Sequence, residues 1–176
     1  MEQYLGKVVY VERTLLGNEI DLVNSSYSGK VEELLESACT YRHYGIGVED
    51  DKIIHFDGDF IAGFNSFEIK ESTVDEFLAG GEMETCFRVS YEYSADEVVE
   101  RAKSSLKTDF GGYHFFKNNC EHFTSWCATG KRISSQVWFM NDDEYDVVEK
   151  AIDRVFEPIL EIAAEIDEMI SSKEES

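Results

Sequence analysis

The sequence is poor in basic residues and contains a single proline. Only 16 of its 176 residues are Lys or Arg, against 37 Asp and Glu, which gives a formal net charge of −21. This balance disfavours nucleic acid as a partner, because phosphate binding needs clustered Lys and Arg, and it disfavours electrostatic docking on an anionic membrane. We interpret most of the charge as a solvated, self-repelling surface.

Long apolar runs are also missing. No stretch approaches the roughly 18 to 20 apolar residues of a membrane span, and the N-terminus carries Glu2 and Lys7 without the apolar core of a secretory signal. We therefore expect no transmembrane segment, at most peripheral membrane contact, and a cytoplasmic location.

The sequence lacks a C-x-x-C pair, a glycine-rich phosphate loop and a dinucleotide fingerprint, so we expect no cofactor. Its cysteines are predicted to be reduced thiols. They are Cys39, Cys86, Cys120 and Cys127.

Short alternating segments and capping patterns predict one α+β domain. The expected strands are residues 8–11, 41–48, 52–56, 66–69, 87–91 and 136–140, with a hairpin turn at 49–51. The expected helices are 31–36, a short one opening at Thr73, 94–107 and 120–129; Thr73 with Glu76 and Ser94 with Glu97 form capping boxes.

The composition changes after residue 140, where Asn141-Asp142-Asp143-Glu144 begins an acidic tail. We expect a domain over 1–140 and an amphipathic helical tail over 141–176. The tail's apolar seam follows a heptad spacing: Val148, Ile152, Val155, Ile159, Ile162, Ile166 and Met169. Packing on the domain is favoured, and a homodimer through the seam is the alternative.

Cys120 falls in the first turn of a predicted helix whose N-cap is Asn119. Free backbone N–H groups and the helix dipole there favour a thiolate, so we expect a lowered thiol pKa. Position alone leaves open a structural cysteine.

A thiol nucleophile needs a base, usually His. His43 and His55 lie on two strands joined by the predicted hairpin, where antiparallel pairing places side chains on one face within contact. One is then expected to act as base and the other to orient it. His122 is expected to point away from Cys120, and His114 has no assigned role.

The box Asn118-Asn-Cys-Glu-His-Phe123 resembles the nucleophile signature of the lecithin:retinol acyltransferase and HRAS-like suppressor family. His-Tyr-Gly at His43 and Ile-His-Phe at His55 are similar to the other active-site segments of that family, in the same order. Further similarities lie at Tyr113, at Gly6-Lys-Val-Val-Tyr-Val11 and at residues 129–137.

The resemblance implies a circularly permuted papain-like fold of the NlpC type, with a small antiparallel sheet packed on the nucleophile helix. It implies Cys120 as nucleophile, His43 as general base and His55 as the orienting residue, and we expect Tyr113, Asn119 and Tyr41 to support them. It further implies a thiol acyltransferase or acyl hydrolase that forms an acyl-thioester from a phospholipid or other acyl lipid.

Two rival functions remain from the sequence: an NlpC-type cysteine amidase or peptidase, and a binding or regulatory protein that retains the His and Asn-Cys boxes. A metal site of His43, His55 and Cys120 fits no standard zinc pattern, so we expect no metal.

Overall fold

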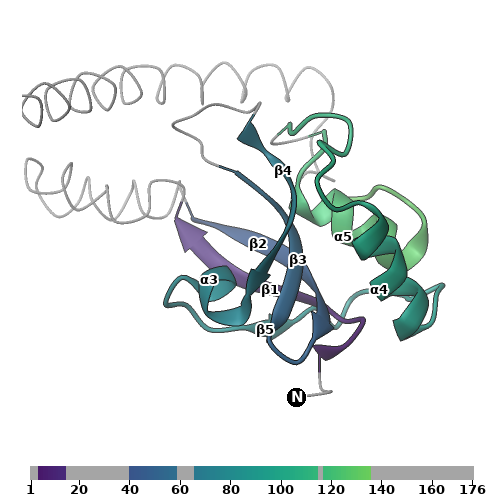
Figure 1. Ribbon diagram of the computed structural model, residues 1–176, viewed down its shortest axis with the longest axis horizontal. Helices are drawn as coiled ribbons and strands as arrows, with labels where there is room; N and C mark the ends of the chain where they lie inside the picture. Colours follow the sequence, from purple (N-terminus) through teal and green to yellow (C-terminus); the bar gives the residue numbers. More distant parts are fainter. Residues whose placement is uncertain (1–3, 15–39, 59–65, 115–116, 136–176) are drawn as a thin grey trace, which may run out of the picture.

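The computed structural model describes residues 4–14, 40–58, 66–114 and 117–135, which form an α+β fold. A five-stranded antiparallel sheet has the order β4-β3-β2-β1-β5 (Figure 1). Its strands are β1 (Val8–Thr14), β2 (Thr40–Glu49), β3 (Lys52–Asp57), β4 (Glu68–Thr73) and β5 (Glu84–Thr85). The predicted hairpin joins β2 to β3, as expected from the polar residues between them.

Helices cover both faces of the sheet (Figure 1). The short helix α3 (Val74–Leu78) lies on one face, and its Phe77 packs with Val9, Val11 and Ile53. The helices α4 (Ala95–Ser104) and α5 (Cys120–Thr129) cover the opposite face and share the larger core with the sheet. Burial of these apolar side chains is the main driving force for holding the layers together.

Both predicted capping boxes are confirmed. The Glu76 carboxylate accepts the Thr73 N–H at 2.7 Å at the start of α3, and the Glu97 carboxylate accepts the Ser94 N–H at 2.8 Å before α4. Each box satisfies backbone donors that the first helical turn leaves unpaired, which is why a four-residue pattern locates these helix starts.

The expected strand at 87–91 is wrong. Main-chain pairing of this segment with β1 ends at Cys86, whose N–H donates to the Val8 carbonyl at 2.9 Å. The Val8 N–H then donates to the Tyr91 hydroxyl at 2.8 Å, so a side chain replaces a strand partner. The chain turns at Phe87, whose side chain is 92% exposed.

Other expected elements shift in extent or cannot be compared. β4 runs to Thr73 rather than Ile69, and α4 ends at Ser104 rather than near Lys107. The predicted helix 31–36, strand 136–140 and tail 141–176 lie outside the described residues. Among the described helices, none has the length and apolar character needed to cross a membrane.

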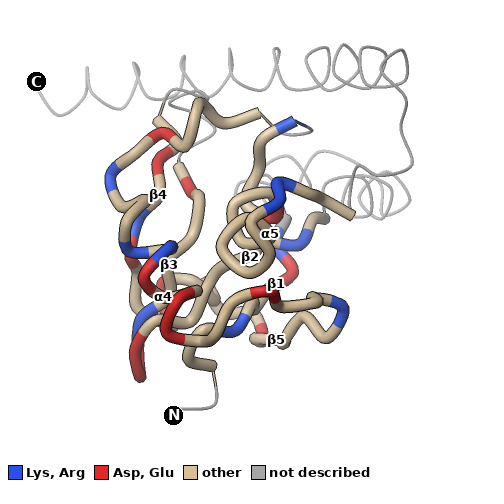
Figure 2. Tube along the Cα trace, turned by 90° about the vertical axis from the view of Figure 1, so that its right-hand side faces the viewer, with Lys and Arg blue, Asp and Glu red and all other residues tan. Residues whose placement is uncertain are grey.

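Acidic and basic residues are interspersed along the described chain, as Figure 2 shows. The expectation that nucleic acid is not a partner remains a prediction from the net charge.

Candidate active site

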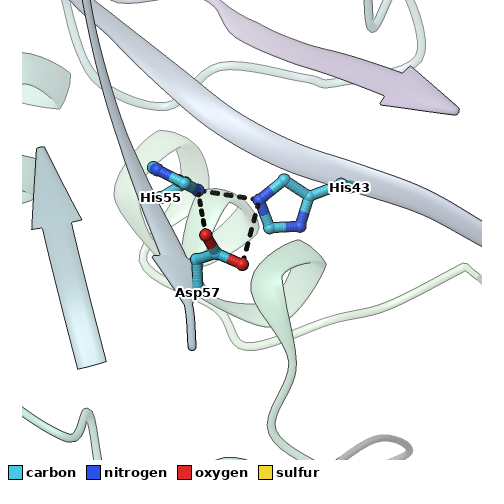
Figure 3. Close-up of side chains that lie close together, drawn as sticks. All are labelled: His43, His55 and Asp57. Atoms are coloured by element: carbon cyan, nitrogen blue, oxygen red, sulfur yellow. Dashed lines mark hydrogen bonds and ion pairs between the residues drawn. The ribbon is translucent and has the colours of Figure 1, made fainter. Parts of the chain in front are cut away.

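Two buried histidines lie in contact on the face of the sheet that α3 covers. The β2–β3 register pairs Gly45 with His55, which places His43, two residues before Gly45, on the same face. The Nε2 atom of His43 lies 2.7 Å from Nδ1 of His55, a hydrogen bond between two side chains that are 2% and 1% exposed (Figure 3). The predicted pairing of these residues is confirmed.

Asp57 completes this group, although the sequence analysis did not single it out. It follows His55 by two residues on β3, so its carboxylate projects from the same face. Its two oxygens face the two rings in Figure 3 and lie 3.9 Å from His43 Nε2 and 3.8 Å from His55 Nδ1. These distances are too long for hydrogen bonds, so the carboxylate acts on both rings through its charge.

Asp57 is also paired with two cations. Lys70 Nζ lies 3.0 Å from Oδ2, and Arg13 lies 3.5 Å from Oδ1. Burial alone would raise the pKa of Asp57, but the two histidines, Lys70 and Arg13 lower it to about 2. The carboxylate therefore stays ionised at neutral pH.

The corner between β4 and α3 contacts the histidine pair from one side. Ser72 Oγ lies 2.9 Å from Nε2 of His55. Phe77 packs against both rings, with centroids 5.4 Å from His43 and 5.3 Å from His55. Glycine at position 45 leaves the room for this ring, because a Cβ there would lie 3.0 Å from Phe77 and 2.4 Å from Ile53.

Burial keeps both histidines neutral. It lowers the pKa of His55 to about 4 and that of His43 well below its usual range; the neighbouring ring adds to the effect on His43. A neutral imidazole has one protonated and one unprotonated nitrogen, as a general base requires.

This burial predicts that the free energy of unfolding falls as the pH drops from about 6.5 towards 4. The unfolded chain binds protons at its histidines near 6.5, whereas folded His55 binds one only near 4, so the unfolded state holds more protons between these values. Below about 4, protonation of Asp57 removes further stability, since its folded pKa is also lowered.

Urea midpoints measured from pH 7 to pH 4.5 test this. Protonation also relieves repulsion among the many acidic residues, which works in the opposite direction. The matched control is therefore His55→Asn, which lacks the imidazole of His55 but keeps the acidic residues and His43. We expect the wild type to lose on the order of 1–3 kcal/mol more than the control over this range. Parallel losses in both proteins would contradict the assignment.

Cys120 lies at the point where β2 and β3 separate. Among the described strands, the β2–β3 ladder ends at Gly45 and His55. Just beyond it, Cys120 Sγ accepts the Tyr44 N–H at 3.4 Å and donates to the Arg42 carbonyl at 3.9 Å. The sulfur thus contacts the main chain on both sides of His43.

The N-terminus of α5 is capped as expected. The Asn119 side chain accepts the N–H groups of Glu121 and His122 at 3.0 and 3.2 Å, and the Asn119 N–H donates to His122 Nδ1 at 3.2 Å. Asn119 therefore positions Cys120 through the helix start, and the His122 ring belongs to the cap.

The expected lowering of the Cys120 pKa is wrong. The side chain is 1% exposed, and burial raises the pKa of its thiol to about 12; the hydrogen bond from Tyr44 lowers it only in part. Desolvation of the thiolate outweighs the helix N-terminus. At neutral pH the side chain is therefore a thiol, not a preformed thiolate.

Tyr41 and Tyr113, which were expected from the sequence to support the site, lie within electrostatic range of Cys120. Tyr41 meets His43 edge-on, with ring centroids 6.1 Å apart, and Tyr113 stacks on Phe67 at 4.0 Å. Burial raises the pKa of both tyrosines, and the proximity of Cys120 adds to it. His114 pairs with Asn118 through the main chain.

A metal ion would find three possible ligands here, His43, His55 and Asp57, whose ligand atoms lie within 4.8 Å of one another. This set differs from the one weighed from the sequence, since Asp57 takes the place of Cys120. Asp57 is already neutralised by Lys70 and Arg13, which repel a dication. The donor set therefore fits a proton-transfer group better than a metal site.

Comparison with known proteins gives one family. The sequence profile described as lecithin retinol acyltransferase matches residues 28–133, which include both histidines, Asp57, Ser72 and Cys120. Protein LEAD-SENSITIVE 1 of Arabidopsis thaliana is 28% identical over 163 residues, covering 65% of this chain and 61% of its own length.

Two further relatives are named lecithin retinol acyltransferase. The protein from Rattus norvegicus is 28% identical, covering 65% of this chain and 59% of its own; that from Bos taurus is 27% identical, covering 68% and 62%. The chain thus spans about three fifths of the length of these relatives. With more than half of its residues inside the profile, the chain belongs to the lecithin retinol acyltransferase family.

Proposed function

We propose that this protein is a thiol acyltransferase or acyl hydrolase that acts on a phospholipid or another acyl ester. The observation that carries the proposal is the placement of Cys120 Sγ against the main chain of both neighbours of His43, while His43 is hydrogen-bonded to His55. Relatives named lecithin retinol acyltransferase support an acyl lipid as the substrate class.

The proton movements follow from the ring contacts. His43 uses Nε2 for His55, so Nδ1 is the nitrogen that takes the thiol proton. As sulfur attacks the acyl carbonyl, the proton passes from Sγ to Nδ1. Collapse of the tetrahedral intermediate breaks the ester C–O bond, the alcohol leaves with the proton from Nδ1, and the acyl group remains on Cys120 as a thioester.

Resolution of the thioester repeats the sequence with another nucleophile. Water, an alcohol or an amine gives its proton to His43 Nδ1 and attacks the thioester carbonyl. The C–S bond then breaks, and the proton returns to sulfur. In both halves, the ionised Asp57 offsets the positive charge that forms on the His43–His55 pair.

The chain order supports the finer fold assignment within this proposal. The histidine strands precede the nucleophile helix, whereas in papain-like enzymes the cysteine comes first. Together with α5 packed on the antiparallel sheet, this order is the one a circularly permuted papain-like fold of the NlpC type requires. The domain division at residue 140, a homodimer through the tail and a cytoplasmic location stay predictions from the sequence.

Incubation with a mixed phospholipid panel, followed by intact-protein mass spectrometry, tests the function. We expect an added mass of one acyl chain, located on Cys120 by peptide mapping and absent from Cys120→Ala. A panel of peptide amides is run beside it. Turnover of amides with no acyl adduct from any lipid would favour an amidase or peptidase and overturn the proposal.

A further inference from the structure

We propose that Ser72 is a positioning residue that completes the proton path of the histidine pair, by accepting a hydrogen bond from His55 whenever His43 is charged. This inference rests on the proposed function and adds a fourth member to Cys120, His43 and His55. It follows from the hydrogen-bonding capacity of each ring nitrogen.

The two rings and the hydroxyl form a chain with only two proton arrangements. His43 Nε2 contacts His55 Nδ1 at 2.7 Å, and His55 Nε2 contacts Ser72 Oγ at 2.9 Å. In the first arrangement, His43 donates from Nε2 to His55, and His55 donates from Nε2 to Ser72. In the second, Ser72 donates to His55, and His55 donates from Nδ1 to His43.

Only the first arrangement leaves a base for the thiol. It places the lone pair of neutral His43 on Nδ1, ready for the proton of Cys120. The second puts a proton on Nδ1 of His43 and the lone pair on its Nε2. That lone pair already accepts the hydrogen bond from His55, so it cannot take the thiol proton. We call these the open and the blocked arrangements.

The charged intermediate admits the open arrangement alone. Once His43 holds two protons, its Nε2–H donates to Nδ1 of His55, so that the proton of His55 sits on Nε2. His55 is 1% exposed, and an N–H buried without an acceptor is costly. The Ser72 oxygen is the acceptor within reach of that nitrogen.

The surrounding structure holds Ser72 in this position. Ser72 pairs with Ile53 across the β3–β4 ladder, on the same face as His55. The next residue, Thr73, starts α3 with its capping box, and Phe77 of that helix packs on both rings. The corner between β4 and α3 thus fixes the acceptor and the ring planes together.

Loss of the hydroxyl should shift the pair towards the blocked arrangement, because an unpaired lone pair on Nε2 costs less than an unpaired buried N–H. For Ser72→Ala we expect kcat to fall about 10- to 100-fold with little change in KM, the size of the cost of leaving one buried N–H donor unpaired. Ser72→Thr keeps the hydroxyl and should restore kcat to within about threefold. Ser104→Ala, an exposed serine on α4, is the matched control.

Nitrogen-15 NMR of the histidine rings reads the arrangement directly and needs no substrate. We expect Nε2–H tautomers for both His43 and His55 in the wild type and in Ser72→Thr. Signal for Nδ1–H should appear at both rings in Ser72→Ala. Unchanged tautomers in Ser72→Ala, or an equal loss of kcat in Ser72→Thr, would overturn the inference.

The two readouts separate this inference from the proposed function. If the wild type cleaves no ester, the proposed function fails, and the tautomers still decide whether Ser72 sets the proton arrangement. If the wild type cleaves esters and Ser72→Ala is as fast with unchanged tautomers, only the inference about Ser72 fails.

Discussion

Replacing Cys120 with alanine should reduce ester turnover by roughly 10⁴- to 10⁶-fold, because it removes the only atom that forms the acyl bond in the proposed mechanism. The Sγ atom makes only weak hydrogen bonds to the main chain of Tyr44 and Arg42, so its loss should cost mainly the small cavity that it leaves, and the variant should still fold. Melting temperature and turnover are measured on the same preparation.

Cys127 provides the matched control for this substitution. It lies two turns further along α5, is fully buried, and burial raises the pKa of its thiol. Cys127→Ala should cost stability through the small cavity that it leaves and should keep kcat near that of the wild type. Full turnover in Cys120→Ala, or loss of turnover in Cys127→Ala alone, would show that Cys120 is not the nucleophile.

The sequence was most informative where one short segment determines the structure. The capping boxes at Thr73 and Ser94 involve residues three apart, and the Asn119 cap fixes the start of α5. The pairing of His43 with His55 was also within reach, because a tight hairpin sets the register between adjacent strands.

Asp57 could have been found from the same reasoning. It stands two residues after His55, and side chains on a strand repeat their face every two residues. Ser72 has no comparable signal. Its contact with His55 depends on the register between β3 and β4, whose connection includes the residues from 59 to 65, so no short spacing relates the two positions.

Burial is the property that the sequence did not supply. A cysteine in the first turn of a helix suggests a stabilised thiolate, yet the pKa of Cys120 is raised to about 12 because the sulfur is enclosed by the sheet and by α5. The direction of the shift depends on which of two opposing effects is larger. That comparison needs the tertiary structure, in which desolvation exceeds the effect of the helix terminus.

Substitutions of the two histidines should lower kcat by different amounts. At His55, the loss should depend on which ring nitrogen the replacement side chain mimics. His43→Ala removes the proposed base and should lower kcat by on the order of 100- to 10,000-fold. In the proposed mechanism, His55 accepts the Nε2–H of His43 through Nδ1 and donates from Nε2 to Ser72. The side-chain oxygen of asparagine occupies nearly the position of Nδ1, whereas that of glutamine reaches the position of Nε2.

We therefore expect His55→Asn to retain more activity than His55→Gln. The asparagine oxygen would still accept from His43, while the glutamine oxygen would face Ser72 and leave His43 without a partner. Rates are compared at saturating ester, with His122→Ala as the control, since that ring caps α5 and its loss should lower the melting temperature but not kcat. Higher activity in His55→Gln than in His55→Asn would mean that the Nδ1 contact with His43 is not the one that orients the base.

A wild-type rate in His43→Ala would require another residue to take the thiol proton. Among the described groups near Cys120, the hydroxyls of Tyr41 and Tyr113 have pKa values too high for that role.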